Sequence, residues 1–160
     1  STFTDSEGEA EGQLIGMLAR NLLSSTAELD IFAFSALEAG SVIGSIVFTR
    51  MTYPDDDRVV FLLAPVAVAT SHHRQGVGSD LIRHGLDVLR NRGVDVVLTY
   101  GDINFYAKVG FAQITENVAK APLPLQYPEG WLGQSLVAPV LKPLIGRGFC
   151  VEALNDGAYW

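Results

Sequence analysis

Two glycines and an arginine lie close together between an apolar run that ends at Val68 and a helical pattern. The segment reads Arg74-Gln75-Gly76-Val77-Gly78-Ser79. Glycine lets the backbone turn sharply and approach a ligand closely. The first turn of a helix leaves up to four N–H groups unpaired beside a partial positive charge, and Arg74 adds a full charge. The segment is therefore a candidate phosphate-binding turn, or else a strand–loop–helix connection whose glycines serve only the turn.

Two common nucleotide motifs do not fit this turn. A P-loop requires GxxxxGK[ST], and no Gly-Lys pair occurs in the sequence. A dinucleotide-binding turn requires a third glycine where Leu81 stands. The turn therefore indicates a phosphate ligand of another kind.

The elements that position this turn are predicted from apolar periodicity and turn residues. They are a helix in Leu14–Leu23, strands at Ile31–Leu37 and Val42–Thr49 joined as a hairpin, a central strand in Arg58–Val68, a helix over Gly76–Asn91 ended by Gly93, a strand at Val94–Tyr100, a short helix over Ile103–Val109 ended by Gly110, and strand-like pieces near Phe111–Val118, Trp131–Val137 and Phe149–Leu154. Pro65 has no N–H, so we expect a bulge or the start of a split there. Strand–helix–strand over residues 58–100 predicts a parallel crossover. The fold class is mixed α/β (α+β with a mixed sheet), in one domain over residues 1–160.

Composition excludes several classes of protein. The longest apolar run, near Val59–Ala69, is shorter than the about 20 residues that a membrane helix needs. No basic-then-apolar leader opens the chain, and the single cysteine, Cys150, suits a reducing, cytoplasmic location. The three histidines have no ligand-spaced partners, so we expect no metal.

Charge is unevenly distributed along the chain. The net charge of −7 disfavours nucleic acid or an anionic membrane as partner. Ser71–Arg92 nevertheless holds four arginines and two aspartates, whereas the rest of the chain holds seven basic and sixteen acidic residues. This distribution permits a small anion in that segment and a cation elsewhere.

The turn and a later segment together resemble the GNAT (Gcn5-related N-acetyltransferase) family. His73–Ser79 resembles its acyl-CoA signature, [QR]-x-x-G-x-[GA]. Leu98–Phe111 contains Gly-Asp-Ile-Asn-Phe-Tyr-Ala-Lys-Val-Gly-Phe, which resembles the GDPxFYxRxGF block of the YhbS-like branch. The resemblance is clear over about Leu37–Phe111. His73 replaces the family's glutamine or arginine, and Ile103 replaces the branch's proline.

The resemblance implies a GNAT-like acyl-CoA N-acyltransferase fold with a splayed central sheet flanked by helices, whose first strand would precede Ser1. It implies acetyl-CoA as the acyl donor and CoA as the product, with pantetheine in the splay. The implied cofactor-binding residues are Val66, Ala67, Val68, His73, Arg74, Gln75, Gly76, Val77, Gly78, Ser79, Asp102 and Phe105. The N–H of Val68 would stabilise the oxyanion. Tyr106 would protonate the leaving thiolate, because tyrosine has a pKa of about 10 and a thiol about 8.5; the alternative is a core aromatic.

We therefore expect an N-acetyltransferase that uses acetyl-CoA and a primary amine of a small-molecule or peptidyl acceptor. The alternatives are a non-catalytic acyl-CoA-binding regulatory module and a plain structural domain. The general base is unassigned: Asp102 is also a helix N-cap candidate, and His84 and Asp87 lie on the solvated half of their helix. Whether Lys108 and Arg83 meet phosphates or solvent stays open. Five aromatic residues of the C-terminal third belong to an acceptor pocket, or to the core and to subunit contacts of a homodimer; they are Tyr127, Trp131, Phe149, Tyr159 and Trp160.

Overall fold

The computed structural model describes residues 20–69 and 76–160. Six strands form one sheet, in the order β1-β2-β3-β4-β6-β5. They are β1 (Ile31–Glu38), β2 (Ser41–Met51), β3 (Val60–Val68), β4 (Val96–Tyr100), β5 (Ala112–Gln113) and β6 (Trp131–Ser135). The helices are α3 (Val77–Asn91), α4 (Ile103–Tyr106) and residues 20–25, with 3-10 turns at Glu28–Asp30, Ala107–Val109, Pro128–Gly130, Glu152–Leu154 and Gly157–Tyr159. Among the described residues no helix is long and apolar enough to cross a membrane.

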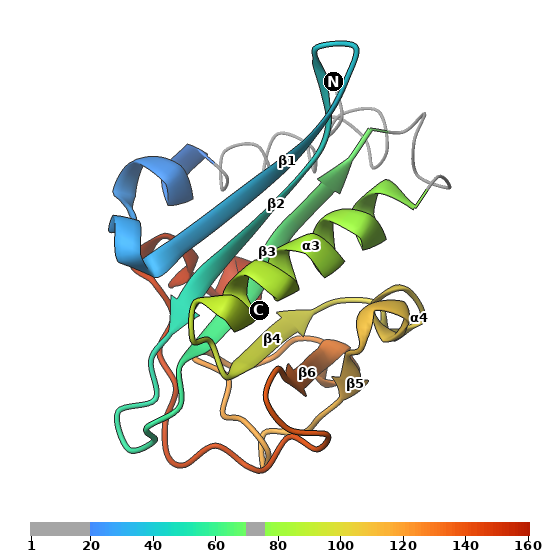
Figure 1. Ribbon diagram of the computed structural model, residues 1–160. Coiled ribbons are helices and arrows are strands. Elements are labelled where there is room, and N and C mark those ends of the chain that lie inside the picture. The colour runs from blue at the N-terminus through green and yellow to red at the C-terminus, as the bar shows by residue number, and fades with distance from the viewer. Residues whose placement is uncertain (1–19, 70–75) are drawn as a thin grey trace.

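The first two strands form the predicted hairpin (Figure 1). Its two-residue turn consists of Ala39 and Gly40, which both have positive φ, at 51° and 82°. Two left-handed residues in succession match the twist of paired strands. The hairpin prediction is therefore confirmed, with a tighter turn than the sequence indicated.

The sheet splits between β3 and β4, its only parallel pair in the described chain. Their pairing runs from Val60↔Val96 to Leu63↔Thr99, although β3 continues to Val68. On its other side, β3 changes register against β2 over the stretch that contains Pro65, between the pairs Ile46↔Val66 and Phe48↔Leu63. The parallel crossover is confirmed, and the structure has both features that were predicted as alternatives at Pro65, a bulge and the start of a split.

Helix α3 covers one face of the sheet, lying across β1, β2 and β3 (Figure 1). Six of its residues are buried on that side: Gly78, Leu81, Ile82, Gly85, Leu86 and Leu89. Gly85 has a steric reason, since a Cβ there would lie 2.6 Å from the ring of Phe48. The helix ends at Asn91, and Gly93 follows with φ +87°, as predicted.

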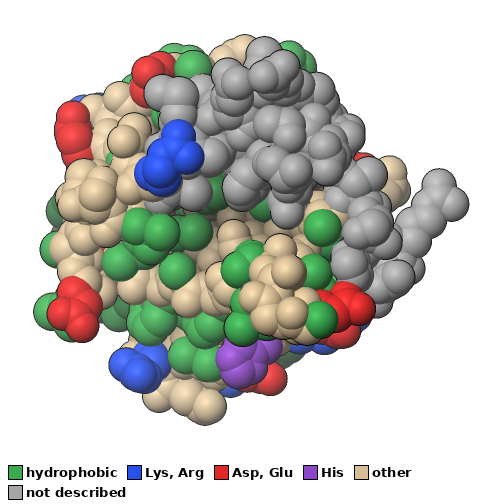
Figure 2. All heavy atoms as spheres, turned by 90° about the horizontal axis from the view of Figure 1, so that it is seen from above, with side chains coloured by type: hydrophobic (Ala, Val, Ile, Leu, Met, Phe, Trp, Pro, Cys, Tyr) green, Lys and Arg blue, Asp and Glu red, His purple; other side chains and the backbone are tan. Residues whose placement is uncertain are grey.

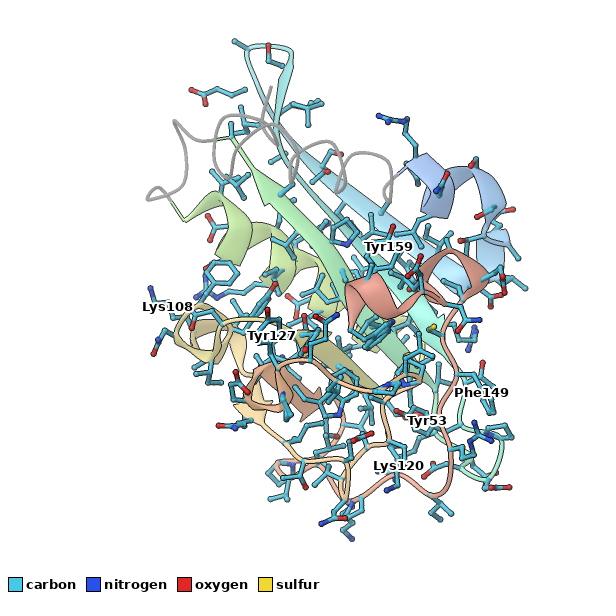
Figure 3. All side chains as sticks on the ribbon, turned by 180° about the vertical axis from the view of Figure 1, so that it is seen from behind. Tyr53, Lys108, Lys120, Tyr127, Phe149 and Tyr159 are labelled. Atoms are coloured by element: carbon cyan, nitrogen blue, oxygen red, sulfur yellow. The ribbon has the colours of Figure 1, made fainter. Side chains whose placement is uncertain are left out.

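The C-terminal third covers the opposite face. Alternate strand residues such as Val60 and Leu62 pack there against Trp131, Leu154 and Trp160. Figure 3 shows this face from behind, with the C-terminal 3-10 turns lying over the strands. Most of this cover is irregular chain.

Two predicted strand-like pieces are therefore wrong or overlong. Only Ala112–Gln113 of the piece near Phe111–Val118 is a strand, and Phe149–Leu154 forms a single bridge, Thr52↔Phe149, followed by a 3-10 turn. Phe111, Ile114 and Leu154 of these pieces are buried by irregular chain rather than by a ladder of paired strands, since apolar periodicity indicates burial and not strand pairing. Of the helix predicted over Leu14–Leu23, the described part is helical and buries Leu22 completely.

Candidate functional site

The candidate phosphate turn leads into α3 through a left-handed glycine. Gly76 is the N-cap residue, with φ +76°, and no side chain of a described residue caps the helix there. A Cβ on Gly76 would meet no atom of the described residues within 4 Å. Within the described part of the chain, the first amides of α3 are therefore left without a side-chain cap, as an anion site at a helix N-terminus requires. His73, Arg74 and Gln75 lie outside the described residues.

Gly78 brings three separate elements together. A Cβ there would lie 3.2 Å from Cγ2 of Val68, at the end of β3, and 3.3 Å from Cζ of Phe105, in α4. Only glycine permits this approach without displacement of a neighbour. Val68, Gly78 and Phe105 thus lie in contact around the start of α3. All three were predicted for one site, although they come from parts of the chain up to about 40 residues apart.

The end of β3 directs peptide groups into the split. The N–H of Ala69 donates to the carbonyl of Ile43 on β2, at 2.8 Å. Because antiparallel ladders alternate, the peptide groups of Ala67 also face β2, whereas those of Val66 and Val68 face the β4 side. The peptide groups of Val66 and Val68 thus point in the direction in which an extended ligand would pair with β3.

Tyr106 lies on α4 in a well-defined aromatic pocket. Its ring meets Phe105 and Phe111 with centroid distances of 4.9 and 5.7 Å. On another side it abuts Gly101, where a Cβ would lie 2.8 Å from Cε2 of the tyrosine. Burial raises the pKa of Tyr106, and a hydrogen bond with Thr99 partly opposes the rise. The hydroxyl is therefore protonated at neutral pH, as a proton donor must be.

Thr99 connects this tyrosine to the point where the sheet splits. It is completely buried, and its hydroxyl donates to the carbonyl of Leu63 at 2.8 Å. Leu63 and Thr99 are also the last pair of the β3–β4 ladder. The Tyr106 hydroxyl thus lies at the apex of the split. Thr99 was not predicted; the available signal was one polar residue in the apolar run of β4.

The candidate bases have other contacts. The carboxylate of Asp102 accepts a hydrogen bond from the N–H of Asn104 at 2.9 Å, so its N-cap interpretation is confirmed. His84 and Asp87 are exposed on α3, as predicted, and Asp87 pairs with Arg90 at 2.8 Å. No general base is identified among these three.

The two undecided cations lie at the surface. Arg83 is exposed, pairs with Asp80 at 3.4 Å and donates to the carbonyl of Lys108 at 3.2 Å. Lys108 projects outward beyond α4 in Figure 3. Seen from the end that carries the hairpin, the described surface has acidic side chains around its rim and few basic ones (Figure 2).

A cavity of about 470 Å³ adjoins Gly101. Its lining residues come from the end of β4, the start of α4, β5 and the turn before β6: Tyr100, Gly101, Asp102, Ile103, Gln113, Tyr127, Glu129 and Gly130. Gly101 both lines this cavity and touches the ring of Tyr106. Gly101 is therefore the residue that lies between the cavity and Tyr106, the candidate proton donor.

Of the five C-terminal aromatic residues, three belong to the core, one lines the cavity and one does neither. Tyr159 is half-buried and packs against the core. Trp131 and Trp160 are buried in the core. Tyr127 is 63% exposed and lines the cavity, and Phe149 is exposed beneath the guanidinium of Arg147. Tyr127 was among the five aromatic residues considered for an acceptor pocket, whereas no sequence pattern distinguished Glu129, because it belongs to an irregular segment.

Comparisons with known proteins agree with this arrangement. In Escherichia coli, YjhQ, named an uncharacterized N-acetyltransferase, is 31% identical over 146 residues, covering 88% of this chain and 80% of YjhQ. E. coli YhbS, named likewise, is 30% identical over 66% of this chain and 60% of its own length.

Solved structures share the fold. The crystal structure of E. coli YhbS in complex with CoA matches with a TM-score of 0.77, at 24% identity, over 94% of this chain and 81% of that one. A GNAT acetyltransferase from Brucella melitensis in complex with acetyl-CoA matches with a TM-score of 0.62, at 22% identity, over 96% of this chain and 86% of that one. The sequence pattern of the acetyltransferase (GNAT) family matches residues 3–111, and the chain belongs to that family.

Proposed function

We propose that this protein transfers the acetyl group of acetyl-CoA to a primary amine, with Tyr106 as the general acid. The observation that carries the proposal is the position of the Tyr106 hydroxyl, protonated and next to Thr99 at the apex of the split between β3 and β4. In the crystal structures of the two similar proteins the ligands are CoA and acetyl-CoA. These ligands support a donor of the same class at the first turn of α3 here.

The donor would be bound mainly by main-chain groups. The amides of Gly76–Ser79 would receive the diphosphate, because a helix N-terminus favours a phosphate anion. The peptide groups of Val66 and Val68 that face the split would pair with pantetheine as an added strand does. His73, Arg74, Gln75, Ala67, Asp102 and Phe105 are included in the proposed donor site because the family resemblance implies them. Of these, Phe105 lies against Gly78.

The reaction would proceed by direct attack. A neutral amine nitrogen attacks the thioester carbonyl carbon, the C–N bond forms, and the C–S bond breaks. The sulfur leaves with the electron pair and takes the proton of Tyr106. The nitrogen releases a proton to water, from which Tyr106 is protonated again. The products are the N-acetylated amine and CoA.

Calorimetry combined with a thiol-release assay tests this proposal. We expect acetyl-CoA to bind with a micromolar Kd, and at least one amine of a broad panel to release CoA in its presence. Tight binding with no release on any amine would support the non-catalytic acyl-CoA-binding module instead. Failure to bind acetyl-CoA would remove both and leave a structural domain.

A further inference from the structure

The cavity beside Gly101 is acidic and aromatic. Two carboxylates, Asp102 and Glu129, and two tyrosines, Tyr100 and Tyr127, line it, and none of the described lining residues is basic. Its volume of about 470 Å³ lies within the range of small-molecule sites, about 300–1,000 Å³. The lining therefore suits a small cation rather than an anion.

Glu129 is held in place by main-chain contacts. It lies in the 3-10 turn Pro128–Gly130, and the carbonyl of Gly130 accepts a hydrogen bond from the N–H of Gly101 at 2.9 Å. A Cβ on Gly130 would lie 3.2 Å from the carbonyl oxygen of Gly101 and from the ring of Tyr100. The 3-10 turn therefore packs closely against the end of β4. This contact fixes the backbone of Glu129 relative to Gly101, the residue that lies against the ring of Tyr106.

The two carboxylates differ in availability. Asp102 already accepts the hydrogen bond from Asn104 that caps α4. Glu129 is exposed, and its carboxylate forms no hydrogen bond or ion pair with any other described residue. Glu129 is therefore the lining acid that is available to a ligand.

The chemistry of acetyl transfer restricts what Glu129 can hold. The nitrogen that attacks the thioester must be uncharged, so a carboxylate that recognises positive charge serves best on a different nitrogen of the same acceptor. We propose that the acceptor is a small amine with at least two basic nitrogens, whose non-reacting ammonium is bound by Glu129 beside the ring of Tyr127. This inference rests on the proposed acetyltransferase function. Aromatic rings attract such cations, which gives Tyr127 a role in the same contact.

Intrinsic fluorescence provides a readout that is independent of activity. The chain has two tryptophans, and both contact the cavity wall: Tyr100 stacks on Trp160 at a centroid distance of 6.2 Å and meets Trp131 edge-on at 6.4 Å. Spermidine is the probe and butylamine its singly charged comparison, titrated at about 0.15 M salt to screen loose binding to the acidic surface. We expect spermidine to change the fluorescence saturably and butylamine to bind at least tenfold more weakly.

Two glutamine variants with the same change in charge make the test specific. Glu129→Gln should raise the Kd for spermidine about fivefold, the size expected for a partly exposed ion pair. Glu28→Gln removes an exposed acid before β1, on the opposite side of the sheet order, and should leave this Kd unchanged. Equal spermidine binding by wild type and Glu129→Gln, or equal binding of butylamine and spermidine, would overturn the inference.

Calorimetry with acetyl-CoA on the same three proteins distinguishes failure of the acceptor inference from failure of the proposed function. We expect one acetyl-CoA affinity for all three. If acetyl-CoA binds and Glu129→Gln leaves spermidine binding unchanged, the acceptor inference fails while the proposed function stands. If acetyl-CoA binds to none of them, the proposed function fails, and the acceptor inference fails with it.

Discussion

At the scale of single residues, the proposed role of Tyr106 as general acid can be tested by one substitution. Tyr106→Phe keeps the ring contacts with Gly101, Phe105 and Phe111 and removes only the hydroxyl. We expect kcat for CoA release to fall about 100-fold, the lower end for loss of a general acid, with an unchanged Kd for acetyl-CoA. Because burial raises the pKa of Tyr106, its proton is retained and the wild-type rate should not decline on the alkaline side below about pH 10. An unchanged kcat in the variant would exclude Tyr106 from the mechanism.

Thr99 makes a second residue-scale prediction. Thr99→Val has the same shape but removes the hydroxyl that contacts Tyr106 and donates to Leu63. Loss of one hydrogen bond, about 1 kcal/mol, should lower kcat about fivefold and leave the KM for acetyl-CoA unchanged. Thr99→Ser retains the hydroxyl and should restore most of the rate. Equal rates in the valine and serine variants would show that Thr99 only fills space.

At the scale of elements, the contact of α3 with β3 and α4 depends on a missing side chain. Gly78→Val would force apart Val68 and Phe105, whose atoms lie 3.2 and 3.3 Å from the position of its Cβ. We expect a loss of about 1–3 kcal/mol in the free energy of unfolding, as for other overpacked sites, and at least tenfold weaker binding of acetyl-CoA. Gly157→Val is the control, because a Cβ there meets no atom of the described chain within 4 Å. Unimpaired acetyl-CoA binding by Gly78→Val would place the donor elsewhere.

At the scale of the whole molecule, an aspartate–arginine pair fastens the C-terminal third to the sheet. Asp56 accepts hydrogen bonds from Nη2 of Arg58 at 2.8 Å and from the N–H of Ile145 at 3.0 Å. Arg58 in turn donates to the carbonyls of Lys142 and Pro143, both at 2.8 Å. The guanidinium of Arg58, aided by main-chain N–H groups, holds the pKa of Asp56 far below its usual value. This pair stabilises the C-terminal third of the chain, in which Tyr127, Glu129 and Gly130 form part of the cavity wall.

The corresponding prediction concerns stability against pH. A carboxylate with a depressed folded-state pKa contributes stability above its unfolded pKa, about 3.9, and loses it as pH falls further. Asp56→Asn should therefore cost about 1–3 kcal/mol of unfolding free energy at pH 7, measured with urea. The difference from wild type should narrow as pH decreases below about 4. A difference of equal size at pH 7 and pH 3 would show that the charge of Asp56 is not responsible.

Local patterns along the chain determine much of this protein. Helical periodicity, glycine terminators and β-formers predicted α3, α4 and the strands β1–β4, because each depends on neighbours along the chain. The missing N–H of Pro65 predicted a bulge or the start of a split, and Asp102 was recognised as a candidate cap from its place before α4. These properties belong to a residue and its immediate surroundings.

Only the tertiary structure decided which residues meet. It placed Gly78 against Phe105, connected Tyr106 through Thr99 to Leu63, and joined Tyr127 and Glu129 to the end of β4. The cavity wall comes from irregular chain, which has no period to reveal its partners, and its contacts span about 30 residues. The sequence alone therefore predicted most of the regular elements and the candidate phosphate-binding turn, whereas the cavity beside Gly101 arose from packing between distant segments, since such packing depends on the fold of the whole chain.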